Sequence, residues 1–249
     1  MKAFFRLLLL IVLAGLSLQL YFVGRIALMA AVDPESTAFE RSAVYSVVTT
    51  TGRLNWRQQW VSYSDMSDNL KRAVIASEDA SFTEHEGVDI EALEKAWDKN
   101  AKAEQRLQQS SPKNADTKAL VKPAKPAKIV GGSTITQQLA KNLFLSGERT
   151  LLRKGQELVL TLLLEKLLSK QRILEIYLNS VEWGEGVYGA QAASQHYYRK
   201  SASKLSAYEA ARLAVMLPRP KYFETRPNSG YLSARAGTIA ARMGGVELP

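Results

Sequence analysis

The chain contains no cysteine, and this absence excludes disulfide bonds, thiol chemistry and zinc sites built on cysteine. Histidine is also scarce. The two histidines, His85 and His196, are far apart in the sequence, and neither has a second histidine close by. We therefore expect no histidine-based metal site and a structural role for both residues.

Acidic residues are outnumbered by basic ones, 24 to 33, which gives a formal net charge of +9. This excess favours an anionic partner, and nucleic acid, phospholipid head groups and a phosphorylated substrate are all open at this point. Ordinary solubility charge is the simpler explanation. With 249 residues, 46% of them hydrophobic, the chain is long enough for one domain of about 200 residues behind a short N-terminal segment.

One long apolar run lies at the N-terminus. Lys2 and Arg6 precede it, and it covers residues 7–23 and continues less strictly to residue 31. About 20 residues suffice to cross a bilayer, so residues 1–31 are predicted to form a cytoplasmic N-terminus and a transmembrane anchor. A cleaved signal peptide is the alternative. It requires small residues at −3 and −1, and here the suitable small residues leave a large side chain at −3.

Residues 32–66 form the predicted linker between the anchor and the domain. Valines and a tyrosine alternate between residues 44 and 48, which predicts an extended segment or a short strand. From residue 67 to residue 249 the pattern changes, because apolar residues recur at helical spacing behind capping residues. We therefore predict a mainly α-helical domain over residues 67–249.

Residues 98–128 interrupt the helical pattern. Proline, alanine and lysine alternate between residues 122 and 128, a composition typical of extended, solvated chain. We predict a mobile basic insertion here, which acts either as a lid over an anionic ligand or as a passive insertion.

The most patterned segment covers residues 131–142. Two glycines are followed by Thr134 and, three residues later, by Gln137, which is the spacing of a capping box at a helix N-terminus. One face of the predicted helix is apolar, and the other carries Gln137, Gln138, Lys141 and Asn142. Free N–H groups in the first turn, with a lysine near them, suit an anionic or polyhydroxylated ligand. A well-capped surface helix without a ligand explains the pattern equally well.

Glu78 ends a predicted helix that begins at Ser67 or Asp68. It lies three residues after Ile75 and four after Val74, on the apolar side of that helix. Partial burial raises the pKa of a carboxylate, which makes Glu78 a candidate general acid or base. A buried salt bridge at a helix end is the equal alternative.

A second carboxylate, Glu157, lies at the polar start of a long apolar helix. Arg153 and Lys154 precede it by four and three residues, so both cations are expected on its helical face. One carboxylate thus has apolar surroundings and the other has cationic ones. Such a difference is typical of carboxylates that divide acid–base roles.

Several of these segments together resemble the motifs of the family 51 glycosyltransferases, the peptidoglycan polymerases. They are Glu78-Asp79-x-x-Phe82-x-x-His85-x-Gly87, Gly132-x-Thr134-x-Thr136-Gln137-Gln138, Arg153-Lys154-x-x-Glu157, Lys170-x-x-Ile173-Leu174-x-x-Tyr177-Leu178-Asn179 and residues 212–217. With no transpeptidase module downstream, the chain is similar to the monofunctional members. The resemblance implies a lysozyme-like helical domain behind one transmembrane helix. The long insertion rich in lysine and proline departs from the family pattern.

The resemblance implies polymerisation of lipid II with inversion at the anomeric carbon and release of undecaprenyl diphosphate. Glu78 is then expected to be the general base for the acceptor's 4-hydroxyl, and Glu157 to orient substrate or cations on the donor side. A divalent cation, Mg²⁺ or Mn²⁺, is a further expectation at Glu78 and Asp79, whereas no organic cofactor is expected. The expected substrate-binding residues are Ser133, Thr134, Gln137, Gln138, Lys141, Asn142, Arg149, Arg153 and Lys154.

The resemblance also predicts a location, the bacterial inner membrane with a periplasmic catalytic domain. Lipid II, the growing glycan chain, membrane lipids and other cell-wall synthesis and division proteins are the expected partners, and nucleic acid is not. Two other functions stay open. A lysozyme-like muramidase also uses a buried glutamate, although a neutral glycan needs no cation cluster. A non-catalytic wall-binding scaffold would not need Glu78 on an apolar face.

Overall fold

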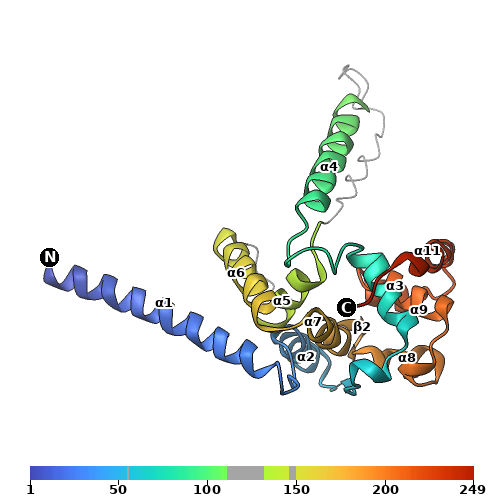
Figure 1. Cartoon of the computed structure of the whole chain (residues 1–249), viewed down its shortest axis with the longest axis horizontal. Helices are drawn as coiled ribbons and strands as arrows, with labels where there is room; N and C mark the ends of the chain where they lie inside the picture. The colour runs from blue at the N-terminus through green and yellow to red at the C-terminus, as the bar shows by residue number, and fades with distance from the viewer. Residues whose placement is uncertain (55, 111–131, 146–149) are drawn as a thin grey trace.

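The computed structural model describes residues 1–54, 56–110, 132–145 and 150–249, and this part of the chain is mostly helical (Figure 1). Its only strands are three very short ones, which confirms the predicted mainly α fold. The helices are α1 (Lys2–Leu28), α2 (Ala38–Thr51), α3 (Asp68–Glu78), α4 (Ile90–Ser110), α5 (Ile135–Phe144), α6 (Leu151–Leu167), α7 (Lys170–Ser180), α8 (Ala190–Tyr198), α9 (Ala207–Met216), α10 (Pro220–Glu224) and α11 (Gly230–Arg242), with 3₁₀ turns at Tyr63–Asp65, Ala202–Lys204 and Met243–Gly245.

The body of the domain packs around one apolar core. Helix α3 packs against α9 and α11, while α5 packs against α6 and α7. The largest fully buried side chains are Trp183, Tyr177, Tyr188 and Phe82. Elements from both ends of the domain sequence therefore meet, and α3 and α11 lie side by side although more than a hundred residues separate them.

A small mixed sheet closes one side of the core. Its order is β1 (Arg57–Gln58), β3 (Val187–Tyr188) and β2 (Glu182–Gly184), with β1 parallel and β2 antiparallel to β3. Gly189 follows β3 with a φ of +81°, and a Cβ there would lie 2.5 Å from the carbonyl oxygen of Asn179. Only glycine allows α8 to begin this close to the end of α7.

Helix α1 extends from the body as a separate arm (Figure 1). Its most apolar stretch is unburied, and its length and composition are sufficient to cross a membrane. The C-terminal half of α1 contacts the domain: Gln19 and Gln156 of α6 exchange amide hydrogen bonds of 2.9 and 3.3 Å. Phe22 packs against Phe144 with ring centroids 5.4 Å apart. One N-terminal apolar helix thus fits single-pass membrane anchoring.

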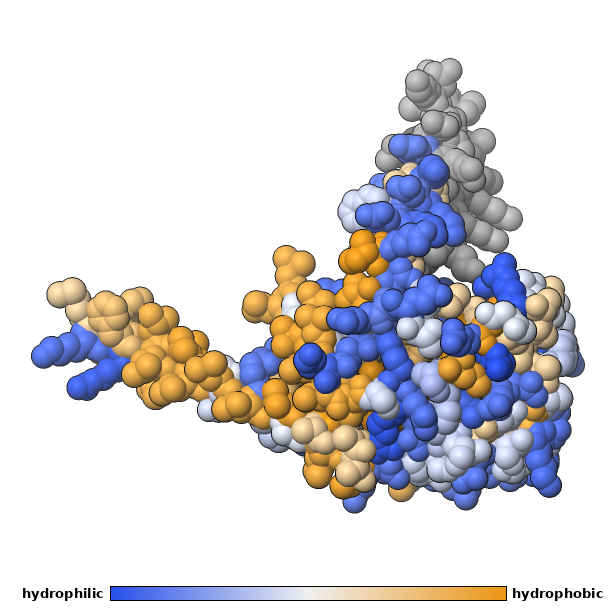
Figure 2. Space-filling model, viewed as in Figure 1, coloured by the Kyte–Doolittle hydropathy of each residue, from blue (hydrophilic) through white to orange (hydrophobic). Residues whose placement is uncertain are grey.

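Apolar side chains gather on α1 and on the adjoining part of the body (Figure 2). Leu151 and Leu152, at the start of α6, are 92% and 88% exposed. Further along the same helix, Leu158, Val159 and Leu162 are exposed as well. Because α1 contacts α6, this apolar surface continues from the arm onto the domain.

Residues 38–51 form α2, and the prediction of an extended segment or a short strand in the linker is wrong here. Thr37 and Glu40 form a capping box, in which the Glu40 N–H donates to Thr37 Oγ1 at 3.0 Å and the Thr37 N–H donates to Glu40 Oε2 at 2.7 Å. Gly52 ends the helix with a φ of +67°. These caps, together with packing of α2 against α5, outweigh the strand-like alternation of its valines.

The first part of the predicted insertion is also helical. Helix α4 runs through residues 98–110 and stands out from the body, so this part of the predicted mobile insertion is a regular helix (Figure 1). Alanine, lysine, glutamine and glutamate dominate this stretch, and all four are good helix formers. Residues 111–128, which hold the proline- and lysine-rich run, lie outside the described residues.

Candidate functional site

Helix α5 begins at the centre of the predicted site. Its N-cap is Thr134: Oγ1 accepts from the Gln137 N–H at 3.1 Å, and the Gln137 side chain accepts from the Thr134 N–H at 3.1 Å. The predicted capping box is therefore confirmed. The Thr134 hydroxyl also donates to the carbonyl of Gly87 at 2.6 Å, and the residue is 3% exposed. The Thr134 hydroxyl thus ties the Gly87 loop to the start of α5, and the residue also lines a cavity beside Glu78, so its predicted contact with substrate stays a prediction.

Asp79 joins the end of α3 to the start of α5. Its Oδ2 accepts from the N–H of Ile135 at 2.9 Å, and its Oδ1 accepts from His85 Nε2 at 2.8 Å. His85 in turn accepts at Nδ1 from the Gly87 N–H at 3.1 Å, which leaves its proton on Nε2. A carboxylate at a helix N-terminus is stabilised by the free N–H groups there. His85 bonds within the turn, as predicted, and orients Asp79.

Glu78 is the last residue of α3 and is half-buried. Its Oε2 accepts from Gln138 Nε2 at 3.1 Å, and its Oε1 accepts from the Ser77 hydroxyl at 3.4 Å. Burial is the main cause that raises the pKa of Glu78, and the charge of Asp79 acts in the same direction, while both hydrogen bonds and the charge of Arg235 oppose it. The predicted direction is confirmed. A base with a raised pKa works closer to neutral pH.

A cavity of about 670 Å³ opens beside Glu78, and we call it the Glu78 cavity. It lies among α3, α4 and α11 and the turn before α5. Charges of both signs surround it. Its basic side chains are Lys95, Lys99, Arg235 and Arg242. The arginines belong to α11, and sequence reasoning missed them because nothing in their local pattern separates them from surface arginines.

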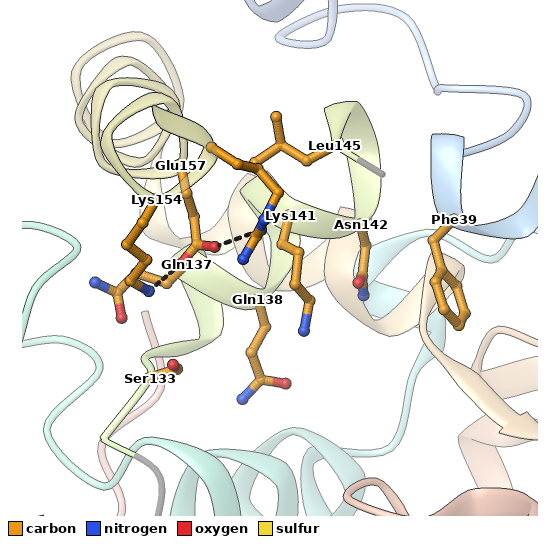
Figure 3. A pocket seen from close by; sticks show the side chains of 10 residues that line it. Phe39, Ser133, Gln137, Gln138, Lys141, Asn142, Leu145, Lys154 and Glu157 are labelled. Carbon is orange, nitrogen blue, oxygen red and sulfur yellow. Dashed lines mark hydrogen bonds and ion pairs between the residues drawn. The ribbon is translucent and has the colours of Figure 1, made fainter. Parts of the chain in front are cut away.

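A second cavity of about 380 Å³, the Glu157 cavity, lies on the other side of the α5 start. Figure 3 shows polar side chains of α5 and α6 converging on it, with Phe39 of α2 at its edge. Ser133 lines both cavities, which therefore adjoin. The predicted substrate-binding residues that line it are Ser133, Gln137, Gln138, Lys141, Asn142, Arg153 and Lys154. Arg149 lies outside the described residues.

Glu157 is 4% exposed, and cations of its own helix balance its charge. One carboxylate oxygen pairs with the guanidinium of Arg153 at 3.1 Å, and the other pairs with the ammonium of Lys154 (Figure 3). Both cations are thus on the helical face that the sequence predicted. The N-cap of α6 is Thr150, which accepts from the Arg153 N–H at 3.2 Å.

Lys141 points into the same cavity (Figure 3). Lys141 is exposed as a residue, yet desolvation of its ammonium is the main cause that lowers the pKa of Lys141. Glu157 opposes this shift, and the like charges of Arg153 and Lys154 add to it. Both ion pairs of Glu157 go to those two residues. Within the described part of the chain, Lys141 therefore offers an ammonium without an ion-pair partner of its own.

The side chains of Asp79, His85 and Asp89 are close enough to hold a metal ion, with ligand atoms within 4.8 Å of one another. Their atoms are already engaged, however. Both oxygens of Asp79 accept hydrogen bonds, and those of Asp89 accept from Ser81 and from the Ala92 N–H. Each Asp79 oxygen accepts one hydrogen bond and keeps a second lone pair, so these bonds do not decide whether a cation binds at Glu78 and Asp79, and that cation stays a prediction.

Tyr177 completes the site from the core side. Its hydroxyl donates to Gln138 Oε1 at 3.0 Å, and the side chain is fully buried on α7. Sequence reasoning grouped Tyr177 with the apolar residues of its helix. The helical spacing placed it in the core correctly, but only the packing of α7 against α5 reveals its contact with Gln138.

Comparison with known proteins identifies relatives that cover these segments. A family model described as Transglycosylase matches residues 46–111 and 114–244. A biosynthetic peptidoglycan transglycosylase of Burkholderia thailandensis is 52% identical over 236 residues, which cover 95% of this chain and 84% of that protein. A protein of the same description from Paraburkholderia phytofirmans is 49% identical over 239 residues, which cover 96% of this chain and 90% of that protein. The matched residues include Glu78, all of α5 and Glu157.

Proposed function

This chain belongs to the transglycosylase family, and we propose that it polymerises the glycan strands of peptidoglycan from lipid II. Membership of the family makes it a peptidoglycan glycosyltransferase, and the lysozyme-like helical domain expected of such enzymes agrees with the fold. In the proposed reaction, a sugar hydroxyl of one lipid II molecule displaces the diphosphate of another.

The observation that carries this proposal is that two carboxylates with opposite surroundings lie on either side of one helix start. Neutral donors bind Glu78, whereas two cations bind Glu157. A muramidase that acts on a neutral glycan needs only the first arrangement. Transfer from a diphosphate donor needs both, because the incoming hydroxyl requires a base and the departing anion requires positive charge.

Glu78 acts on the acceptor. Its carboxylate takes the proton of the acceptor's 4-hydroxyl while that oxygen forms a bond to the anomeric carbon of the donor. The bond between this carbon and the diphosphate breaks, and the electron pair leaves with undecaprenyl diphosphate. Attack on the face opposite the leaving group inverts the anomeric configuration. The raised pKa of Glu78 makes its carboxylate a stronger base than an exposed glutamate.

The cations of the Glu157 cavity act on the donor. Lys141, Arg153 and Lys154 offer positive charge where the diphosphate departs. Glu157 binds Arg153 and Lys154, which lowers their mutual repulsion and leaves Lys141 for the substrate. The polar side chains for the sugar and phosphate oxygens are Ser133, Gln137, Gln138 and Asn142.

Helix α1 would hold this site at the bacterial inner membrane. Lys2 and Arg6 precede the span, so we place the N-terminus in the cytoplasm and the domain in the periplasm. Because about 20 residues cross the hydrocarbon core, Gln19 would lie at the depth of the outer leaflet, and so would its partner Gln156 of α6. The exposed leucines of α6 would then contact lipid, beside the cations that meet the diphosphate.

Binding of Mg²⁺ or Mn²⁺ at Glu78 and Asp79 stays a prediction, and no step above uses a divalent metal ion. To test for this metal ion, the polymerisation rate is measured in EDTA and again with added Mg²⁺. The melting temperature of the protein is measured under the same two conditions. Interaction with other cell-wall synthesis and division proteins also stays a prediction.

Incubation of the full-length protein with lipid II tests the proposed function. We expect products that muramidase digests to disaccharide-peptide units, and no such products from Glu78→Gln. Glu86→Gln is the matched control, because Glu86 is an exposed carboxylate of the neighbouring turn. Cleavage of preformed glycan strands without polymerisation would favour a muramidase instead. Binding of glycan with no turnover of either kind would favour a scaffold.

A further inference from the structure

Three side chains form a hydrogen-bonded line from the core to Glu78. The Tyr177 hydroxyl donates to Gln138 Oε1 at 3.0 Å, and Gln138 Nε2 donates to Glu78 Oε2 at 3.1 Å. We propose that Tyr177 is a positioning residue, which acts through Gln138 to determine which oxygen of Glu78 receives the acceptor's proton. This inference rests on the proposed function of Glu78 as the base.

The direction of the line follows from Tyr177. Its side chain is fully buried, so its hydroxyl proton needs an acceptor inside the protein. Burial, together with the charges of Glu78 and Asp79, raises the pKa of Tyr177 well above its ordinary value, so the phenol keeps its proton and remains a donor. The amide oxygen of Gln138 receives that proton. The amide NH₂ group of Gln138 must then face Glu78.

The opposite orientation of Gln138 is unfavourable at both ends. A flipped amide would direct its oxygen at the carboxylate of Glu78, so two acceptors would face each other. At the other end its NH₂ group would donate to the Tyr177 oxygen, and the buried hydroxyl proton would lose its acceptor. An unsatisfied buried donor is costly. The Tyr177 hydroxyl therefore selects one of the two amide orientations.

This selection leaves one oxygen of Glu78 available for chemistry. Oε2 is engaged with Gln138 at 3.1 Å, whereas Oε1 has only the longer contact with Ser77 at 3.4 Å. Oε1 is therefore the atom that takes the proton, while Gln138 prevents the carboxylate from rotating. A general base must stay within hydrogen-bond reach of the proton that it abstracts, so a loosely held carboxylate lowers kcat without weakening substrate binding.

Tyr177→Phe in the full-length protein is the direct test. We expect kcat to fall about two- to tenfold, with KM for lipid II unchanged. This range corresponds to the net free energy of one neutral hydrogen bond. Tyr197→Phe is the matched control. It also removes a tyrosine hydroxyl bond, the one of 2.8 Å to the Trp183 carbonyl, but away from Glu78, and it should leave kcat unchanged.

A double-mutant cycle with Gln138→Met separates positioning from packing. If Tyr177 acts through Gln138, Tyr177→Phe has no further effect on kcat once Gln138 is methionine. An equal loss of kcat in both backgrounds would show that Tyr177 contributes only to packing, and the inference would be overturned.

NMR of the Gln138 side-chain amide gives a readout that does not depend on activity. In Tyr177→Phe, its proton shifts and exchange rates should change, and an unchanged amide signal would refute the positioning role even if Glu78 is the base. If instead Glu78→Gln polymerises normally, the proposed function fails while the amide signal still reports on Tyr177.

Should Tyr177→Phe not fold, 3-fluorotyrosine at position 177 keeps a stronger donor. It should preserve kcat and shift the Gln138 carbonyl carbon, and an unshifted carbonyl would also refute the inference.

Discussion

Glu78→Gln should produce an enzyme that is almost inactive and at least as stable as the wild type. Glutamine has nearly the shape of glutamate, and its side-chain oxygen can accept the 3.1 Å bond that Gln138 now donates to Glu78. The network with Gln138 is therefore kept. What the substitution removes is the ability to take a proton, and the loss of a general base typically lowers a rate by about two to four orders of magnitude.

The stability expectation follows from the raised pKa of Glu78, whose main cause is burial. The folded protein holds a proton on Glu78 at pH values where the unfolded chain has already released it. The free energy of unfolding therefore falls as the pH rises from the ordinary value of 4.5 through the folded pKa, and it stays lower above that range. A neutral glutamine lacks this penalty. The advantage of the variant should thus be largest on the alkaline side.

Three measurements on each variant test this reasoning. They are glycan-strand formation from lipid II, a lipid II binding isotherm, and thermal unfolding on both sides of that pH window. Glu86→Gln, at an exposed carboxylate, should match the wild type in all three. Near wild-type polymerisation by Glu78→Gln would refute the role of Glu78 as base. If Glu78→Gln is less stable than the wild type at alkaline pH, the claim that burial of the Glu78 carboxylate raises its pKa is refuted.

The remaining predictions concern the donor side, the linker helix and one backbone contact. Glu157→Gln should weaken lipid II binding, and increasingly so as the pH rises, because Glu157 opposes the lowering of the pKa of Lys141; an isotherm equal to the wild type at alkaline pH would contradict this. Glu40 is fully buried, and burial raises its pKa from 4.5 to about 7. The free energy of unfolding of Glu40→Gln, relative to the wild type, should therefore grow by about 3 kcal/mol from low to high pH, as measured by denaturant unfolding. Gly189→Ala should lower the free energy of unfolding by roughly 2 kcal/mol or more, because its Cβ would lie 2.5 Å from the Asn179 oxygen, and an unchanged melting temperature would exclude that clash.

Local hydrogen-bond partners made the start of α5 predictable from the sequence. Thr134 and Gln137 cap it with contacts between residues three apart, and such contacts need no knowledge of the fold. The apolar neighbours of Glu78 were predictable for the same reason, since they follow from helical spacing. Arg153 and Lys154 could likewise be placed on the face of Glu157, because all three belong to one helix.

Two segments were misread because competing local signals had to be weighed without their packing. In residues 38–51 the alternating valines favoured a strand, but the box between Thr37 and Glu40 and the contact with α5 decide for a helix. In residues 98–110 the helix-forming residues were grouped with the proline run that follows them. The intrinsic helix propensity of these residues, taken without the proline run, predicts the helix that the structure has there.

The parts of the site that the sequence could not supply depend on contacts between distant elements. Tyr177 reaches Gln138 only because α7 packs against α5, and Arg235 approaches Glu78 only because α11 packs against α3. Thr134 shows the converse. Its hydroxyl looked available in the sequence, but in the fold it is used by the carbonyl of Gly87.

The start of α5 relates the two halves of the site to each other in space. Asp79 binds the first N–H of α5, so the end of α3, which carries Glu78, is fixed to the helix that carries Gln138 and Lys141. Gln138 contacts Glu78, and Lys141 lies three residues later in the Glu157 cavity, which is a rise of about 4.5 Å along one face of the helix. An in-line displacement needs the base and the leaving-group charge on opposite sides of a single carbon, a few ångströms apart. One rigid helical turn with a buried carboxylate at its N-terminus provides that separation before any substrate binds. Loosening Asp79 should therefore impair both half-sites together, whereas changes at Glu78 or Glu157 impair one half each.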